Sequence, residues 1–521
     1  MKRFWALTGS MGDLLACLAG VLLPFSLAPY GVVVLAPLSV LLLLLTVMQP
    51  AQWQQLSVWR LTGRYFLYGV GSFGVGVSWV YVSIHDYGYT SVALAIFVTV
   101  LWVLGLSMVL ALPWWVWHRC VVQRQQKGVM DCGLLAGFAA VWVLNEWVRS
   151  WLLTGFPWLY IGYSQTLTWL GGWAPLLGVF GVSLMTVLPV VLLFGALQSP
   201  SVKSVSCCVA VTVLALLGGR YCGEHAWTTP QPTATQAVSL IQGNVLQEQK
   251  WRPEQRQAIR QLYRNMTEPE LVPGQLVVWP EAAIPELYTP AHPFFTEMQT
   301  QLQQRGGALI AGVPSLHYDN EGRRMYYNSL LSLGEAQGFY HKRRLVPFGE
   351  YVPLQDWVEG LLDFFKLPIS DFRRGPAEQT NLSTGSLTVA GSICYEIAYP
   401  DLVAEQAGTA DFLLTVSNDS WFGHSIGPHQ HLQMAQMRAR ENGRILLRAT
   451  SNGITAIVQP TGEISASLPQ FQPGILHGRV MAYAGQTPFQ RTGSWPALLL
   501  CVGLFCASVL RAGGQQNNPL R

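Results

Sequence analysis

The sequence predicts an α/β domain inserted into a polytopic α-helical membrane domain of about eight spans. Residues 1–218 are almost continuously apolar, residues 219–490 have the composition of a soluble domain, and residues 495–510 are apolar again. The 521-residue chain is half hydrophobic, only 12% charged and contains 20 tryptophans, which is far from a soluble average. Within the central region, short apolar runs alternate with amphipathic segments. We therefore expect a seven-span domain at 1–218, an α/β domain outside the bilayer at 219–490, and a last span with a short tail at 491–521.

The apolar regions divide into segments long enough, or nearly long enough, to span a bilayer. These lie at about 11–28, 31–48, 65–83, 91–117, 133–153, 174–197 and 204–218, with an eighth at 495–510. The first segment carries no small-residue cleavage site, so we interpret it as a retained span and not as a signal peptide.

The basic residues of the short loops define an orientation. Alternate loops and the termini hold Lys2, Arg3, Arg60, Arg64, Arg119, Arg124, Lys127, Lys203, Arg511 and Arg521. The short loops on the other side, about 84–90 and 154–173, contain no Lys or Arg. Because positive charge is retained inside, both termini are expected in the cytoplasm and residues 219–490 outside it, against the outer face of the membrane.

Two features of the apolar region could be more than packing. Glu146 and Arg149 lie three residues apart in one predicted span, and ionisable residues at membrane depth are candidates for function. A mutual ion pair near the interface is an equally good interpretation. The aromatic, uncharged stretch 154–163 favours an aromatic belt in the headgroup layer over a specific site.

The central region is predicted element by element. Residues 226–237 are expected to be a linker. Strands are expected at 238–241, 276–279, 308–313, 328–333, 338–340, 387–393, 412–416, 445–449 and 454–458, and helices at 253–268, 293–305 and 428–443. Strands and helices that alternate in this way predict a layered α/β sandwich.

Three strand ends carry reactive side chains. Glu281 follows the run 276–279, Lys342 follows 338–340, and Cys394 ends 387–393. A carboxylate, an amine and a thiol are the parts of an acyl-transfer site. Glu281 would serve as the base if its pocket were dry enough to raise its pKa, and Lys342 would stabilise the oxyanion. Taken alone, Cys394 could equally be a buried structural cysteine.

Other chemistries have little support in the sequence. The formal charge of +4 comes without a basic stripe, so nucleic-acid binding is not expected. The nine cysteines form no metal-ligand or disulfide pattern, and the histidines at 424, 429 and 431 have no carboxylates at ligand spacing beside them. We predict no metal and no cofactor.

Five motifs in order resemble those of apolipoprotein N-acyltransferases, which are membrane-embedded members of the nitrilase superfamily. They are Gly243–Trp251, Trp279–Pro285, Tyr340–Pro353, Ser392–Glu396 and Asn418–Gly423. The resemblance covers essentially the whole chain. It implies an αββα nitrilase-like sandwich with Glu281 as general base, Lys342 as stabiliser of the tetrahedral intermediate and Cys394 as nucleophile. Positions that support the site or bind substrate in the family match Glu350, Tyr395, Glu396, Trp251, Asn328 and Trp421.

The resemblance also implies a ping-pong reaction. Cys394 would take the sn-1 acyl chain of a phospholipid, typically phosphatidylethanolamine, as a thioester. The chain would then pass to the α-amine of the N-terminal S-diacylglyceryl cysteine of an apolipoprotein. A thioester keeps most of the energy of the donor ester, so no metal or nucleotide is needed. We expect the protein to be a monomer. Its expected partners are the bilayer, the donor lipid and the apolipoprotein.

Two hypotheses concern contacts with lipid. The apolar stretch 361–370 is proposed as a lid, with Phe364, Phe365 and Leu367 lining the entry of the acyl chain, although an ordinary core helix would have the same pattern. The basic residues of 438–448 could bind phosphate headgroups, but a solvated charged face is the favoured interpretation.

Two other functions remain to be weighed. A membrane-bound amidase or nitrilase-type hydrolase would use the same three residues, with water in place of the amine, but a simple tether needs one span. A transporter or receptor would show polar, broken spans, and those here are largely featureless apart from Glu146 and Arg149. Loss of Cys394 should inactivate an enzyme and leave a receptor intact.

Overall fold

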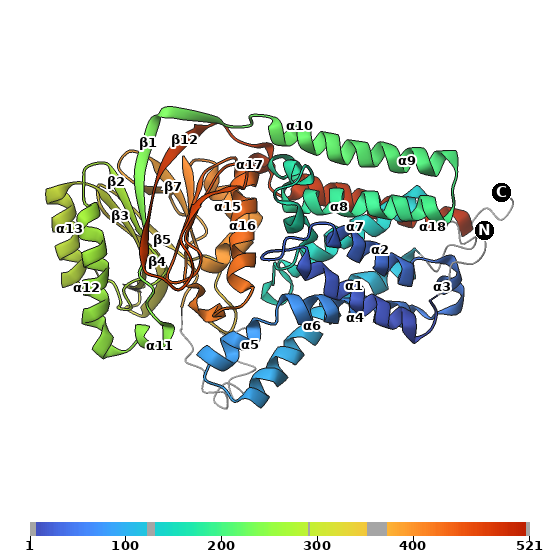
Figure 1. Ribbon diagram of the computed structural model, residues 1–521, viewed down its shortest axis with the longest axis horizontal. Helices are drawn as coiled ribbons and strands as arrows, with labels where there is room; N and C mark the ends of the chain where they lie inside the picture. Colours follow the sequence, from blue (N-terminus) through green and yellow to red (C-terminus); the bar gives the residue numbers. More distant parts are fainter. Residues whose placement is uncertain (1–6, 122–130, 290–291, 352–371, 517–521) are drawn as a thin grey trace. The chain divides into compact units, whose positions relative to one another are not determined.

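The expected insertion of an α/β domain into a helical one is confirmed by the chain's division into two units (Figure 1). The computed structural model describes residues 7–121, 131–289, 292–351 and 372–516. One unit, 1–225 with 492–521, is helical, and the other, 226–491, contains two β-sheets. The helical unit includes α10 (Gly219–Glu224), so the α/β unit begins at 226 and not at 219.

The α/β unit is built on two six-stranded sheets, in the orders β12-β1-β2-β3-β4-β5 and β11-β10-β9-β8-β7-β6. The strands of the first sheet are β1 (Thr229–Gln242), β2 (Gln275–Trp279), β3 (Ala308–Tyr318), β4 (Arg324–Gly334), β5 (Phe339–His341) and β12 (Gly474–Ala484). Those of the second are β6 (Leu382–Ser383), β7 (Thr388–Ile393), β8 (Phe412–Ser417), β9 (Leu446–Thr450), β10 (Ala456–Val458) and β11 (Ile464–Ser467).

The predicted linker at 226–237 is wrong for most of its length. Residues from Thr229 onward belong to β1 and pair antiparallel with β12, with Thr229 opposite Ala484. The register shifts between Gln231 and Thr235, so the proline- and threonine-rich part forms an irregular strand. The sequence signal of a linker came from this irregular part, whereas the pairing partner lies more than 200 residues away along the chain.

Side-chain alternation along the strands creates two cores. On β2, Leu276 and Val278 belong to a buried cluster shared with β7, β8 and β9, so they lie between the sheets. Val277 and Trp279 belong to a second cluster with α12 (Arg256–Thr267) and α13 (Pro293–Arg305). Because successive residues of a strand face opposite sides, one strand serves both cores.

Helices complete the layers of the α/β unit. α15 (Pro400–Ala407) and α16 (Gly427–Asn442) pack on the second sheet, as α12 and α13 do on the first, which confirms the αββα sandwich (Figure 1). The unit also contains the short helix α11 (Gln247–Lys250), and α17 (Pro488–Thr492) lies at its end.

Strand directions bring two of the predicted catalytic residues to one edge. β2 runs parallel to β3, β4 runs antiparallel to β3, and β5 runs antiparallel to β4. β2 and β5 therefore point the same way, and their carboxyl ends lie at the same edge of the first sheet. Glu281 and Lys342 follow these two ends, while Cys394 follows β7 of the second sheet.

In the helical unit, each of the eight predicted apolar segments overlaps a helix. The helices are α1 (Ser10–Phe25), α2 (Leu35–Val47), α3 (Pro50–Gln55), α4 (Val58–Gly76), α5 (Val80–Val82), α6 (Val92–Cys120), α7 (Cys132–Arg149), α8 (Ala174–Gln198), α9 (Val202–Val213), α10 and α18 (Trp495–Gln516). By length and composition, four helices of the described residues could cross a membrane, or five if a bent pair at 58–87 is one span. The count of eight spans remains a prediction, because α1 and α2 are shorter.

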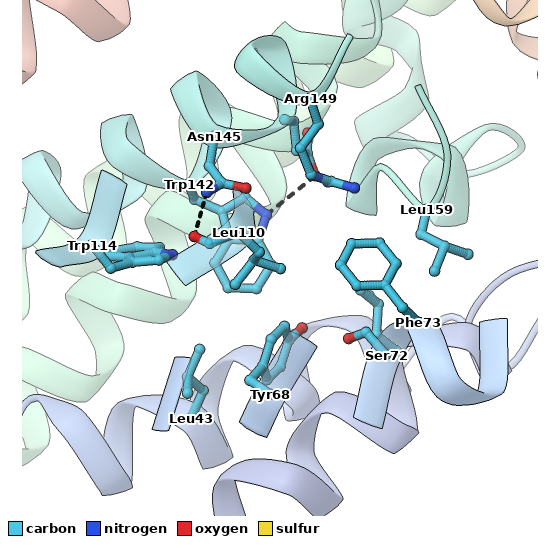
Figure 2. A pocket seen from close by; sticks show the side chains of 12 residues that line it. Leu43, Tyr68, Ser72, Phe73, Leu110, Trp114, Trp142, Asn145, Arg149 and Leu159 are labelled. Carbon is cyan, nitrogen blue, oxygen red and sulfur yellow. Dashed lines mark hydrogen bonds between the residues drawn. The ribbon is translucent and has the colours of Figure 1, made fainter. Parts of the chain in front are cut away.

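Glu146 and Arg149 line a pocket within the helical unit and bond the loop that follows α7. Figure 2 shows the side chains of Tyr68 and Phe73 on one side of this pocket and those of Trp142 and Arg149 on the other. Arg149 Nη1 donates to the carbonyl oxygen of Trp158 at 2.9 Å, and Glu146 Oε1 accepts from the backbone N–H of Ile161 at 2.8 Å. The sequence had suggested either a functional pair or a mutual ion pair for Glu146 and Arg149, and neither interpretation anticipated these contacts with the loop.

The loop itself differs from the predicted aromatic belt. Residues 155–166 are buried within the helical unit, and the rings of Phe156 and Trp158 stack with centroids 5.6 Å apart. A belt in the headgroup layer would expose these rings. The buried loop is held instead by the two ionisable side chains of α7, which gives Glu146 and Arg149 a structural role.

Candidate active site

Glu281 is a buried carboxylate with a partner on each oxygen. Its Oε1 accepts from Asn328 Nδ2 at 2.7 Å and lies 3.4 Å from Lys342 Nζ. Its Oε2 accepts from the backbone N–H of Asn418 at 2.8 Å. The turn after β2 also needs a glycine on β3, since a Cβ at Gly312 would lie only 2.6 Å from Glu281 Cα. These contacts fix both the position and the orientation of the carboxylate.

Lys342 lies between two carboxylates. Its Nζ donates to Glu350 Oε1 at 2.9 Å and to Glu281 Oε1 at 3.4 Å, and the side chain is 1% exposed. Asn328 Nδ2 bridges the same two carboxylates, at 2.7 Å from Glu281 and 2.9 Å from Glu350. Since two like charges without a cation repel each other in a dry site, Lys342 and Asn328 hold the pair together. The structure thus brings Glu281, Lys342, Glu350 and Asn328 into one cluster.

Cys394 sits in a strained backbone conformation where β7 ends and a short 3₁₀ helix (Cys394–Ala398) begins. Its φ of +53° is in the left-handed region, which costs a residue with a side chain about 1–2 kcal/mol. Ala282, next to Glu281, and Phe348, near Glu350, also have positive φ. Strained residues of this kind cluster at functional sites. The residue itself is partly exposed.

Glu396 joins the segment after Lys342 to the segment around Cys394. Its Oε1 accepts from the backbone N–H groups of Arg343 at 2.5 Å and Arg344 at 3.0 Å, and its Oε2 accepts from that of Ile393 at 2.8 Å. The hydroxyl of Tyr340 donates to both oxygens at 3.0 Å. The fully buried carboxylate therefore supports the site through the backbone and does not belong to its reactive surface.

Burial and charge set the protonation states of the three predicted catalytic groups. Burial raises the pKa of Glu281, but Lys342, Asn328, the Asn418 N–H and Lys250 outweigh it, so the pKa lies below its usual value. Burial and then the charge of Glu281 raise the pKa of the Cys394 thiol well above its usual value, against the opposing effect of Lys342. Burial lowers the pKa of Lys342, yet Glu350 and Glu281 outweigh burial, so that the pKa is raised.

The pKa shifts of these three groups correct the expectation for Glu281 and define the protonation state of the resting site. The sequence suggested that a dry pocket raises the pKa of Glu281, whereas the cationic and hydrogen-bonding neighbours lower it. At neutral pH the site therefore holds a carboxylate at Glu281, an ammonium at Lys342 and a protonated thiol at Cys394. A thiol of this kind loses its proton only as it attacks, which is general-base chemistry and not a preformed thiolate.

Two residues that contact Glu281 were missed as site residues. Lys250 is 1% exposed and donates from Nζ to the carbonyl oxygen of Glu281 at 3.1 Å. Burial, partly offset by the charge of Glu281, lowers the pKa of Lys250 to about 8. Asn418 donates its backbone N–H to Glu281 and its side-chain Nδ2 to Gln247 at 2.8 Å. Both residues lie in motifs that the sequence had singled out, so their place in these motifs was the available signal.

The remaining predicted site residues are placed as follows. Tyr395 is 8% exposed and packs edge-on against Tyr399, with ring centroids 5.4 Å apart. Trp251 follows α11, and Trp421 lies in the 3₁₀ turn Asp419–Phe422; they are 50% and 40% exposed. The predicted lid residues Phe364, Phe365 and Leu367 lie outside the described residues.

Three of the four arginines of 438–448 are buried, so they form no solvated face. Arg438 and Arg448 are fully buried, and Arg444 is 3% exposed. Arg438 Nε lies 2.7 Å from Glu441 Oε2, and Arg448 Nη2 lies 2.6 Å from Asp419 Oδ2. Both interpretations are wrong for these three arginines, because carboxylates neutralise Arg438 and Arg448, and Arg444 donates to two backbone carbonyl oxygens.

Comparison with known proteins supports the family resemblance on both parts of the chain. The family model described as carbon-nitrogen hydrolase matches residues 231–489, and the model described as apolipoprotein N-acyltransferase N-terminal domain matches residues 19–192. The relatives include curated proteins named apolipoprotein N-acyltransferase. That from Azotobacter vinelandii is 43% identical and covers 98% of this chain and 97% of its own. Those from Pseudomonas aeruginosa and Methylococcus capsulatus are 43% and 40% identical, over 99% and 94% of this chain and 98% and 94% of theirs.

Proposed function

Since the chain belongs to the apolipoprotein N-acyltransferase family, we propose that it transfers an acyl chain from a phospholipid to the N-terminal cysteine of lipoproteins. It is an acyltransferase of the membrane, and its acceptors are lipoproteins. The observation that carries its mechanism is the meeting of Glu281 and Lys342, 3.4 Å apart, beside the partly exposed thiol of Cys394, whose acidity both of them influence.

In the first half-reaction, the thiol of Cys394 becomes acylated. The sulfur attacks the ester carbonyl carbon of the phospholipid while Glu281 accepts the thiol proton. Lys342 stabilises the negative charge that develops on the carbonyl oxygen. The carbon–oxygen ester bond then breaks, Glu281 returns the proton to the leaving oxygen, and a lysophospholipid departs. The lowered pKa of Glu281 keeps this base ionised and ready at neutral pH.

In the second half-reaction, the acyl chain moves to an amine. The α-amine of an S-diacylglyceryl cysteine attacks the thioester carbonyl and gives a proton to Glu281. The carbon–sulfur bond breaks, and the sulfur of Cys394 takes that proton back. Glu350 and Asn328 serve as positioning residues, because they fix Lys342 and Glu281 by hydrogen bonds of 2.9 Å and 2.7 Å. Glu396 and Tyr395 support the segment of the nucleophile, and the exposed Trp251 and Trp421 contact the lipid.

We also propose the acyl donor, the orientation of the protein in the membrane and its oligomeric state. The donor is phosphatidylethanolamine, and the protein works as a monomer. The pattern of basic loop residues supports an inner-membrane protein with both termini in the cytoplasm and the catalytic unit on the periplasmic side. Both substrates are anchored in lipid, so lateral diffusion delivers them to a site that is attached to the membrane.

A two-product assay tests the function. Purified protein is mixed with phosphatidylethanolamine and a peptide that begins with S-diacylglyceryl cysteine, and both N-acylated peptide and free fatty acid are measured. We expect peptide acylation that Cys394→Ala abolishes and that Cys506→Ala, which removes another thiol, leaves intact. Release of fatty acid to water at the same rate with and without peptide would identify a hydrolase instead.

A further inference from the structure

A buried histidine contacts the backbone of the predicted nucleophile. His431 lies in the first half of α16 and is 1% exposed. Its Nε2 lies 3.0 Å from the carbonyl oxygen of Cys394. A carbonyl oxygen only accepts hydrogen bonds, so Nε2 must carry a proton and donate. Because this nitrogen is already engaged with the backbone, His431 is placed to orient Cys394 and not to deprotonate its thiol.

The opposite edge of the ring is fixed by a charged pair. His431 Nδ1 lies 3.1 Å from Asp419 Oδ1 and 3.1 Å from Arg448 Nη2, and Arg448 Nη2 lies 2.6 Å from Asp419 Oδ2. Ser417 Oγ donates to Asp419 Oδ1 at 2.6 Å. Asp419, His431 and Arg448 come from a turn, a helix and a strand, respectively. All three are buried, so the orientation of the imidazole ring is strongly determined.

Hydrogen bonds thus bracket Cys394 on both sides. Before it, the N–H of Ile393 donates to Glu396, and after it, the carbonyl oxygen of Cys394 accepts from His431. A residue at φ +53° keeps that conformation only where its surroundings hold it. The sequence predicted a supporting role for Glu396 but no role for His431.

We propose that Asp419, His431 and Arg448 form a positioning cluster, in which the Nε2–H of His431 holds the backbone of Cys394 so that its sulfur faces Glu281 and Lys342. The inference rests on the proposed function, because it assigns a role in forming the acyl-enzyme. It predicts that the donor at Nε2 matters for the rate of acylation, while the binding of the lipid does not depend on it.

A matched pair of variants separates the two edges of the ring. Gln places an amide N–H near the position of Nε2, whereas the shorter Asn reaches only the position of Nδ1. We expect His431→Gln to form the thioester with phosphatidylethanolamine within about threefold of the wild-type rate. His431→Asn should be slower by about tenfold to a hundredfold, the effect of about 1.4–2.8 kcal/mol in the transition state, with KM for the lipid unchanged.

Alkylation of Cys394 by iodoacetamide provides the control, because a small reagent does not need the aligned site. Both variants should be alkylated within about threefold of the wild-type rate. Equal acylation rates for His431→Asn and wild type, or an equally slow His431→Gln, would overturn the proposal. If wild type itself forms no thioester, the proposed function has failed and not merely the role of His431.

A second variant covers the case in which His431→Asn does not fold. Asp419→Asn keeps His431 in place but removes the charge that orients its Nδ1. It should slow thioester formation about tenfold while KM stays unchanged, which is the loss expected for one hydrogen bond of about 1.4 kcal/mol. An acylation rate equal to that of wild type would again overturn the positioning role.

Discussion

Replacing Lys342 by Met should leave two buried carboxylates without their shared cation. Lys342 Nζ lies 2.9 Å from Glu350 and 3.4 Å from Glu281, and all three side chains are nearly inaccessible to solvent. Removing one partner of a buried ion pair costs about 3–5 kcal/mol, because the remaining charge stays buried. For a unit of this size, that loss lowers the melting temperature by about 6–20 °C.

The loss of stability caused by Lys342→Met should depend on pH. In the wild type, the pKa of Glu281 is lowered, so its contribution to stability is present above the unfolded value of about 4.3 and is lost only below it. The raised pKa of Lys342 makes its contribution complete at any pH below about 10.4. In Lys342→Met, burial without this cation raises the pKa of Glu281, so the folded variant takes up a proton and gains stability as the pH falls.

The assay is the melting temperature of purified protein at pH 8 and pH 5, for wild type, Lys342→Met and the double variant with Glu350→Gln. We expect a large decrease for Lys342→Met at pH 8, a smaller one at pH 5, and partial recovery at pH 8 in the double variant. None of the variants should regain acyl transfer, since the oxyanion loses its cation. A decrease of equal size at both pH values would refute the electrostatic reasoning.

Three further predictions concern Lys250, Cys394 and Glu146. Lys250→Met should slow acylation about tenfold, the effect of losing one charge-assisted hydrogen bond to Glu281 of about 1.4 kcal/mol. In the wild type, the free energy of unfolding should rise between pH 8 and pH 10, because the pKa of Lys250 is about 8 when folded and about 10.4 when unfolded. Lys250→Met should lose this rise, and a rise that persists in the variant would contradict the prediction. The rate of Cys394 alkylation, obtained by difference from Cys394→Ala, should keep increasing through pH 9, since the thiol pKa is well above about 8.5, and a plateau near pH 8.5 would be inconsistent with it. Glu146→Leu should lower the melting temperature by about 2–12 °C, whereas Glu146→Gln, which retains an acceptor for the Ile161 N–H, should lower it less; equal losses would argue against the loop contact.

The sequence was most informative where periodicity and strand ends determine structure. The continuous apolar run at 276–279 predicted β2, and Glu281, which follows this strand, lies beside Lys342 in the structure. Glu281 and Lys342 meet because β2 and β5 run in the same direction, and contact between Glu281 and Lys342 therefore follows from topology. Family motifs then singled out Glu350 and Asn328, which the structure places on the same cluster.

Contacts between distant polar residues were less predictable. The arginines of 438–448 seemed solvent-exposed because the sequence does not show that Asp419 and Glu441 are buried beside Arg448 and Arg438. The role of His431 was hidden for the same reason, since its partner is a backbone carbonyl 37 residues away. The sign of the Glu281 pKa shift depends on four neighbours, and burial, the one effect that the sequence suggested, acts in the opposite direction.

The central claim is that Cys394 carries the acyl chain as a thioester, and intact mass tests it most directly. Wild type, Cys394→Ala and Cys506→Ala are incubated with phosphatidylethanolamine in the absence of peptide. We expect the mass of one acyl chain to be added to wild type and Cys506→Ala only, and to be removed by hydroxylamine or by a diacylglyceryl-cysteine peptide. An acyl adduct of equal yield on Cys394→Ala would contradict the account, and so would peptide acylation by that variant.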